Sequence, residues 1–181
     1  MSNVRPHKAS SQVFAEFHTQ HLVLRPFAPA DTADLFRFMS NASAMQHTYV
    51  APSLEECSAR LNAYEAMRAT LGFAPWVVSA VETGKAVGWG GLCVDPEEPE
   101  WGLEVIYAFS PIVWGKGHAT ELVLFSLAYA FGPLSAPQVH AFAKPENGRS
   151  VRVLEKCGFN HLRYEPRLQR SHYVAHVPGA A

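Results

Sequence analysis

The pattern of hydrophobic and polar positions along the chain predicts seven strands and four helices. The predicted strands are residues 21–27, 75–81, 86–94, 101–109, 139–143, 159–164 and 172–176. The predicted helices are residues 32–40, 53–70, 115–131 and 147–157. In chain order there is a strand, two helices, three strands, a helix, a strand, a helix and two strands. This order predicts an α/β chain with a strand meander in front and βαβ-like crossovers behind.

Local signals set several of these boundaries. Ser53 with Glu56 three residues later has the form of a capping box, and Gly72 is placed to end the helix that Ser53 begins. The sequence Glu-Thr-Gly-Lys at residues 82–85 is typical of a tight hairpin turn. Helix 115–131 is apolar on almost every side, so we expect it to be buried.

The composition is typical of a single folded domain. We expect residues 1–18 to form a loose leader and residues 19–181 to form one domain. The 181 residues are 48% hydrophobic with a formal net charge of -1, which argues against disorder and against a dedicated nucleic-acid binder. No apolar run is long enough to span a membrane and no signal peptide is visible, so we expect a cytoplasmic protein without a membrane partner.

The segment from Pro111 to Thr120 has the features of a phosphate-binding loop. It follows a strand and leads into a helix, whose first turn offers unpaired N–H groups and the positive end of the helix dipole. Gly115 and Gly117 let a ligand approach the backbone closely, and Lys116 adds a positive charge. The spacing excludes the Walker A and G-x-G-x-x-G motifs. An ordinary glycine turn before a helix is the alternative.

Four segments, in the right order, resemble motifs of the GNAT acetyltransferase superfamily. Residues 114–121, WGKGHATE, are similar to its acetyl-CoA pyrophosphate loop, and residues 147–159, with NGRS followed by VLEKCGF, resemble its second motif. Residues 19–26, TQHLVLRP, and the strands of residues 72–92 are similar to the ribosomal-protein-alanine acetyltransferase (Rim-type) branch. The resemblance covers about residues 19–165, most of the chain.

The resemblance implies a mixed, largely antiparallel sheet with helices on both faces and a splayed pair of central strands. Acetyl-CoA would bind in that split, and no metal would be needed. The backbone of Ala108, Phe109 and Ser110 would contact the pantetheine arm, together with the side chain of Asn147. The residues expected near the pyrophosphate are Trp114, Gly115, Lys116, Gly117, His118, Ala119 and Thr120.

The resemblance also implies direct attack by an amine on the thioester, in a ternary complex without an acyl-enzyme. The acceptor would be either the N-terminal α-amine of a protein or a small-molecule amine, and we expect the loops 41–52 and 165–171 to line its groove. A non-catalytic CoA-binding or protein-interaction module on the same fold is the alternative, and a homodimer is left open.

Glu104 is the candidate general base. It is a lone carboxylate in the otherwise apolar strand 101–109. Burial disfavours the charged form, so we expect its pKa to rise toward neutrality, where a base for an ammonium substrate works best. The family's E-x-x-Y strand supports this role. The alternative is a carboxylate at a strand end that reaches water.

The sequence departs from the family pattern at the position of the usual acid. Leu154 stands where many GNAT enzymes have a tyrosine, and Ile112 and His21 are further departures. Ser150 lies one helical turn before Leu154, so we expect it to protonate the departing thiolate or to donate a hydrogen bond to it. Asn147 is in any case a suitable N-cap for the helix 147–157.

The remaining candidates predict structure rather than chemistry. The histidine pairs His18 with His21 and His172 with His176 have the wrong geometry for one ion on strands, so we expect no metal site. The three cysteines form no CxxC pair, which suggests neither a zinc site nor a disulfide framework. The aromatic residues expected in the core are Trp76, Trp89, Trp101, Phe125 and Phe131.

Overall fold

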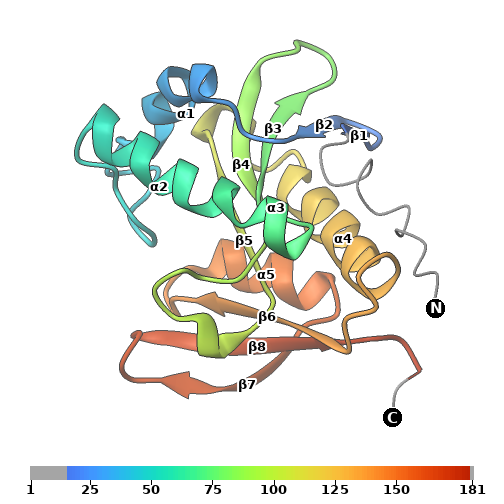
Figure 1. The fold of residues 1–181 in the computed structure, drawn as a ribbon. Helices are drawn as coiled ribbons and strands as arrows, with labels where there is room; N and C mark the ends of the chain where they lie inside the picture. Colours follow the sequence, from blue (N-terminus) through green and yellow to red (C-terminus); the bar gives the residue numbers. More distant parts are fainter. Residues whose placement is uncertain (1–15, 180–181) are drawn as a thin grey trace, which may run out of the picture.

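The computed structural model describes residues 16–179, which form a mixed sheet with helices on both faces (Figure 1). The strands are β1 (Phe17–His18), β2 (Leu22–Arg25), β3 (Trp76–Ala80), β4 (Ala86–Cys93), β5 (Glu104–Phe109), β6 (Gln138–Ala143), β7 (Asn160–Glu165) and β8 (Arg170–His176). The helices are α1 (Thr32–Met39), α2 (Leu54–Ala66), α3 (Arg68–Leu71), α4 (His118–Phe131) and α5 (Gly148–Lys156). The strand order is β1-β2-β3-β4-β5-β6-β8-β7, and only β5 and β6 are parallel neighbours among the described strands. The predicted fold class is confirmed.

The predicted elements are present, with shifted boundaries. Ser53 caps α2 by accepting the N–H of Glu56, but the predicted helix 53–70 is divided at Met67 into α2 and α3. The strand expected from residue 101 begins only at Glu104, because Pro99–Trp101 forms a 3-10 turn.

The leader expected over residues 1–18 falls mostly outside the described residues. Its last two residues, Phe17 and His18, form β1 and pair with β2. The first strand of the domain therefore begins before residue 19.

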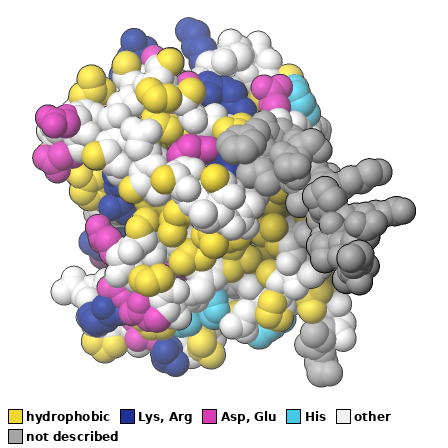
Figure 2. All heavy atoms as spheres, viewed as in Figure 1, with side chains coloured by type: hydrophobic (Ala, Val, Ile, Leu, Met, Phe, Trp, Pro, Cys, Tyr) yellow, Lys and Arg dark blue, Asp and Glu magenta, His cyan; other side chains and the backbone are white. Residues whose placement is uncertain are grey.

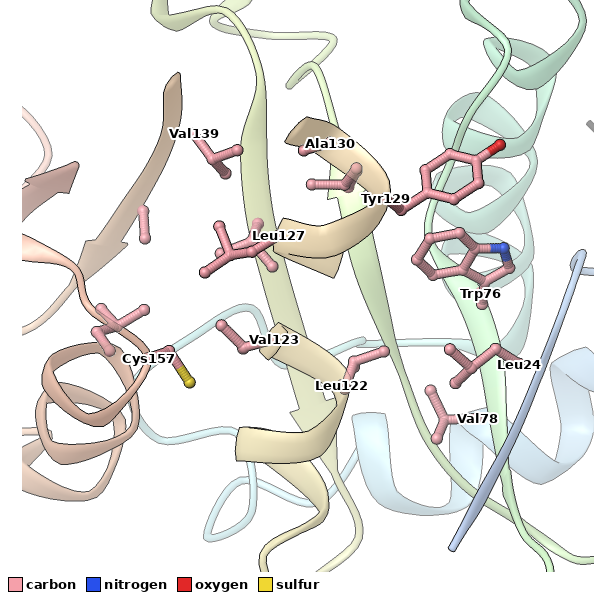
Figure 3. Close-up of a cluster of buried hydrophobic side chains, with 14 of the residues drawn as sticks. Leu24, Trp76, Val78, Leu122, Val123, Leu127, Tyr129, Ala130, Val139 and Cys157 are labelled. Atoms are coloured by element: carbon pink, nitrogen blue, oxygen red, sulfur yellow. The ribbon is translucent and has the colours of Figure 1, made fainter. Parts of the chain in front are cut away.

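Each face of the sheet has its own hydrophobic core. Side chains of α4 and α5 pack on one face, and those of α1 and α2 pack on the other. In Figure 3, Leu122, Val123 and Leu127 of α4 lie between Trp76 and Val78 on one side and Val139 and Cys157 on the other. Each fully buried side chain of this size contributes about 1.5–3 kcal/mol, so α4 is firmly held against the sheet.

The burial predicted for α4 is correct on its inner side only. Leu122 and Val123 are fully buried, whereas Leu124 is 50% exposed. One side of the helix therefore faces solvent despite its apolar sequence.

The sheet opens between its two parallel strands. β5 and β6 share the register pair Glu104↔His140, and the His140 N–H donates to the Leu103 carbonyl over 2.8 Å. Beyond that point the described parts of β5 and β6 have no further register pair. The predicted split of the central strands is thus present along most of β5.

Hydrogen bonds to β4 decide which backbone groups of β5 face this split. The Ser110 N–H donates to the Val87 carbonyl over 2.8 Å, on the β4 side. Alternate residues of an antiparallel strand direct their N–H and C=O groups to opposite sides. The backbone groups that face the split are therefore those of Val105, Tyr107 and Phe109.

Candidate active site

A cavity of about 260 Å³ lies at the split between β5 and β6. Its wall is formed by residues of β5, β6, the first turn of α5, α2 and the segment 94–103. Both loops expected at the acceptor groove reach it. The loop 41–52 contributes Met45, His47, Thr48 and Tyr49, and the second loop contributes Leu168 and Arg170.

The glycine loop before α4 has an open backbone surface. Gly115 and Gly117 have φ angles of 79° and 86°, in the left-handed region that favours glycine, and no atom lies within 4 Å of a Cβ built on either residue. α4 begins at His118 without a side-chain cap, and its first helical hydrogen bond runs from Glu121 to Gly117. The N–H groups of residues 118–120 are therefore directed at open space, which suits a phosphate group.

Trp114 connects this loop to the end of β5. Its indole N–H donates to the Phe109 carbonyl over 2.9 Å, and the Arg149 guanidinium lies 4.7 Å from its ring centroid. The Phe109 carbonyl is therefore occupied, but the Phe109 N–H still faces the split.

The backbone of Ala108 is paired with Trp89 of β4. Two of the three expected pantetheine contacts, Ala108 and Ser110, therefore face β4 rather than the split.

Glu104 is buried in the cavity wall without a protein partner. Its side chain is 6% exposed and makes no hydrogen bond or ion pair with any residue from 16 to 179. Burial raises the pKa of Glu104 to about 8, the negative charges of Asp95 and Glu98 act in the same direction, and Arg170 opposes them. The expected rise toward neutrality is confirmed, and the alternative of a solvated carboxylate at a strand end is not.

A tyrosine that the sequence interpretation did not select joins Ser150 in the cavity. The hydroxyls of Tyr107 and Ser150 are 2.7 Å apart, and burial raises the pKa of Tyr107 above its usual value. Tyr107 follows Glu104 by three positions on β5, so the E-x-x-Y pattern was the signal that could have identified it. Leu154, one turn below Ser150, is buried in the core.

Asn147 performs the capping role that its sequence position predicts. Its side-chain oxygen accepts the Ser150 N–H over 3.2 Å at the start of α5. Both side chains border the cavity, so the cap also fixes the position of Ser150.

The cavity wall also contains aromatic and charged residues outside the expected loops, and the sequence interpretation missed Arg60, Tyr64 and Asp95. The Arg60 guanidinium lies 4.7 Å from the ring centroid of Tyr49 and 5.5 Å from that of Tyr64. The Tyr64 hydroxyl donates to Asp95 over 3.4 Å. Hydrophobic side chains also gather on the surface below α2 and α3 in Figure 2.

The aromatic residues expected in the core divide between core and cavity. Trp76 is in the core, and Phe125 and Phe131 are partly buried and pack against this core. Trp89 is buried but also borders the cavity, and Trp101 borders the cavity and packs edge-on against Phe142. Trp101 is therefore part of the site wall.

The described residues include no group of three side chains suited to a metal ion. The three cysteines are all free and buried. Within residues 16–179, every helix is too short or too polar to cross a membrane.

Residues 21–160 match the model of the acetyltransferase (GNAT) domain. This chain is a GNAT acetyltransferase by family. The chain is 27% identical over 145 residues to the protein YkkB of Bacillus subtilis (strain 168), and the match covers 79% of this chain and 84% of YkkB.

Solved structures share this GNAT fold. An acetyltransferase of Agrobacterium tumefaciens str. C58 superposes with a TM-score of 0.79 at 23% identity, over 98% of this chain and 99% of that one. AAC(6')-Ib in complex with paromomycin and acetyl-CoA superposes with a TM-score of 0.71 at 18% identity, over 86% of this chain and 93% of that one. A ribosomal-protein-S5-alanine acetyltransferase of Vibrio fischeri also has the fold. At these identities the structures show the fold alone, and the Rim-type branch stays a prediction.

Proposed function

We propose that this protein transfers the acetyl group of acetyl-CoA to a primary amine by direct attack in a ternary complex. The observation that carries the proposal is the buried Glu104 carboxyl, which has no partner among residues 16–179 and borders the cavity at the β5–β6 split. Membership of the GNAT family supports acetyl transfer.

The residues on the cofactor side fit acetyl-CoA. The open backbone at Gly115 and Gly117, where a Cβ would meet no protein atom, leaves room for the pyrophosphate against the N–H groups of residues 118–120. Lys116 would add a charge interaction, and the N–H of Phe109 and the C=O of Tyr107 would pair with the pantetheine amides. Acetyl-CoA supplies an acetyl group activated as a thioester.

The proposed chemistry assigns one proton transfer to each side of the split. Glu104 takes one proton from the acceptor ammonium, directly or through a water, and the free amine nitrogen forms a bond to the acetyl carbon. The carbon–sulfur bond breaks, and the Ser150–Tyr107 hydroxyl pair donates a hydrogen bond to the departing thiolate. The second proton that the nitrogen loses as the amide forms passes to the thiolate through this hydroxyl pair or through water. A backbone N–H that faces the split stabilises the negative charge on the acetyl oxygen.

The Ser150–Tyr107 pair also bears on the non-catalytic alternative. The one sequence feature in favour of a CoA-binding module without turnover is Leu154, which cannot donate a proton. Two hydroxyls 2.7 Å apart on the same cavity supply the donor that Leu154 lacks, and this favours the enzyme.

A thiol-release assay with acetyl-CoA and a panel of acceptors tests the proposal. The panel should contain peptides with free N-termini, diamines, aminoglycosides and amino acids, with the acetylated product identified by mass spectrometry. We expect amine-dependent release of CoA. Binding of acetyl-CoA by calorimetry without release above the rate of hydrolysis, for every acceptor, would establish the non-catalytic module instead.

A further inference from the structure

Arg170 borders the cavity without an anionic partner. It is the first residue of β8 and half-buried, and its side chain makes no hydrogen bond and no ion pair within 4 Å to the described part of the chain. Burial lowers the pKa of Arg170 below its usual value. Five other arginines do have carboxylate partners: Arg25 with Asp31, Arg37 with Asp34, Arg68 with Glu65, Arg163 with Glu165 and Arg167 with Glu98.

The carboxyl groups around Arg170 do not neutralise it. Glu165, its cross-strand neighbour on β7, is paired with Arg163. Glu104 and Glu146 act on Arg170 electrostatically, but neither comes within ion-pair distance. Because the pKa of Glu104 is about 8, that carboxyl is mostly protonated at neutral pH. A partly desolvated guanidinium without an anion is unfavourable, and a ligand carboxylate would complete the site.

Arg60 is the other arginine in the cavity wall, and it differs from Arg170 in having aromatic and hydrogen-bond partners. Its guanidinium lies over the rings of Tyr49 and Tyr64, and it donates to the Tyr64 hydroxyl over 3.4 Å. Arg170 has neither kind of contact. Arg170 and Glu104, the carboxyl that would receive the amine proton, line the same cavity, and the charge of Arg170 acts to lower the pKa of Glu104.

The cavity also limits the size and polarity of the acceptor. Its volume of about 260 Å³ is below the range of roughly 300–1,000 Å³ that is typical of sites for drug-sized ligands. Trp89, Trp101 and Phe142 line the same cavity as Glu104 and Arg170, and the rings of Trp101 and Phe142 are in edge-on contact. A small acceptor with an apolar or aromatic body fits these walls better than a large polycation.

We propose that the acceptor is a small amine that also carries a carboxylate, of the class of apolar and aromatic α-amino acids. Arg170 binds the carboxylate, Glu104 faces the amine, and the side chain lies against the aromatic wall. This inference rests on the proposed acetyl transfer and adds the identity of the acceptor class.

The test compares acceptors that differ only in the carboxylate. Phenylalanine, leucine and methionine are each assayed beside their amides, which keep the amine and the side chain but lose the negative charge. We expect the wild-type protein to prefer the acids by about 10- to 100-fold in kcat/KM, the range for a hydrogen-bonded charge pair. In Arg170→Gln the preference should disappear, mainly through KM, and Arg170→Lys should restore part of it.

Two controls separate binding from other effects. Loss of Arg170 also changes the electrostatics of Glu104, but this alters the rates with acid and amide alike, so the ratio between them isolates carboxylate binding. Arg37→Gln removes an exposed arginine that does not line the cavity and should keep the preference. Acetyl-CoA binding by calorimetry verifies that each variant is folded.

The outcomes distinguish this inference from the proposed function. If amides, peptides or diamines are acetylated but the acids are not preferred, or the preference survives in Arg170→Gln, the acceptor class is wrong and acetyl transfer stands. If no acceptor releases thiol, the proposed function itself fails. A preference for acids that depends on Arg170 supports both.

Discussion

The proposed pyrophosphate site and the cavity proposed for the acceptor differ in which parts of the chain form them. The pyrophosphate site depends on one continuous segment, residues 114–120, and mainly on its backbone: two glycines in the left-handed region and the first turn of α4. The acceptor side depends on side chains from α2, β5, β6, β8 and the segments 41–52 and 94–103. The charge and shape of this side therefore depend on the particular side chains that those elements carry.

This difference has a physical basis. A pyrophosphate is recognised by N–H groups, which every residue except proline offers, so the loop needs glycines and a helix start but few particular side chains. An amine acceptor is recognised by charge, shape and a matched pKa, which only particular side chains supply. The comparison therefore predicts that substitutions on the two sides affect different measurements.

The largest effect is expected at Glu104. Glu104→Gln keeps the size of the side chain and removes its basicity, so kcat/KM should fall by about 10²–10⁴ while acetyl-CoA affinity is unchanged. In the wild type, the ionised fraction of Glu104 grows as the pH rises through its pKa of about 8, so kcat/KM should rise over that range. The variant should lack this rise, and the exposed Glu97→Gln should keep it. A Glu104→Gln profile equal to the parental one would make Glu104 structural.

The same substitution should stabilise the fold at high pH. The folded pKa of Glu104, about 8, is above its ordinary value of 4.5. Between these values the unfolded state holds fewer protons than the folded state, so wild-type stability falls as the pH rises, by at most about 1.4 kcal/mol per pH unit. Unfolding free energies of Glu104→Gln and wild type should diverge from pH 5 to pH 8 and then run parallel. A constant difference over that range would contradict the desolvated carboxyl.

Smaller effects are expected at the hydroxyl pair. Ser150→Ala and Tyr107→Phe should each lower kcat by about 10- to 100-fold, or roughly 1.4–2.7 kcal/mol. The Asn147 cap bonds to the Ser150 backbone, so α5 should remain intact in Ser150→Ala. Because the two hydroxyls act through one hydrogen bond, the double variant should lose little more than either single one. If acetyl-CoA affinity drops while kcat holds, Ser150 is only a cofactor ligand or helix-cap residue.

The sequence predicted the parts of the site that depend on local pattern. Glu104 was recognisable as one carboxylate in an apolar strand, Asn147 as a cap, and residues 114–120 as a glycine loop before a helix. Arg60 was missed because it reaches the cavity only through packing of α2 on the sheet. Arg170 lies in the loop 165–171 that was expected at the groove, but it was not singled out because its place in the cavity depends on the order β5-β6-β8. No local pattern distinguishes them from solvated arginines.

The direction of the backbone hydrogen bonds of β5 also could not be predicted from the sequence. The resemblance selected Ala108 and Ser110 as pantetheine contacts, and the pairing of β5 with β4 turns their backbone groups away from the split. A shift of one residue along a strand reverses the direction of every such group, and only the register of β4 and β5 fixes it. Element identities were predicted well because they depend on short-range periodicity, which does not require this register.

The smallest expected effect tests the cofactor side with a matched pair of glycines. Gly117 and Gly84 both have φ in the left-handed region, 86° and 65°, and a Cβ on either would meet no atom within 4 Å. Substitution by alanine should therefore cost each of them about the same stability, roughly 1–2 kcal/mol, through backbone strain alone. Gly84 lies in the hairpin turn between β3 and β4, whereas Gly117 caps α4 at the proposed pyrophosphate site. Gly117→Ala should weaken acetyl-CoA binding about 10-fold by calorimetry, because its methyl group occupies space that the phosphate needs, and Gly84→Ala should not. Equal affinity in the two folded variants would place the pyrophosphate elsewhere.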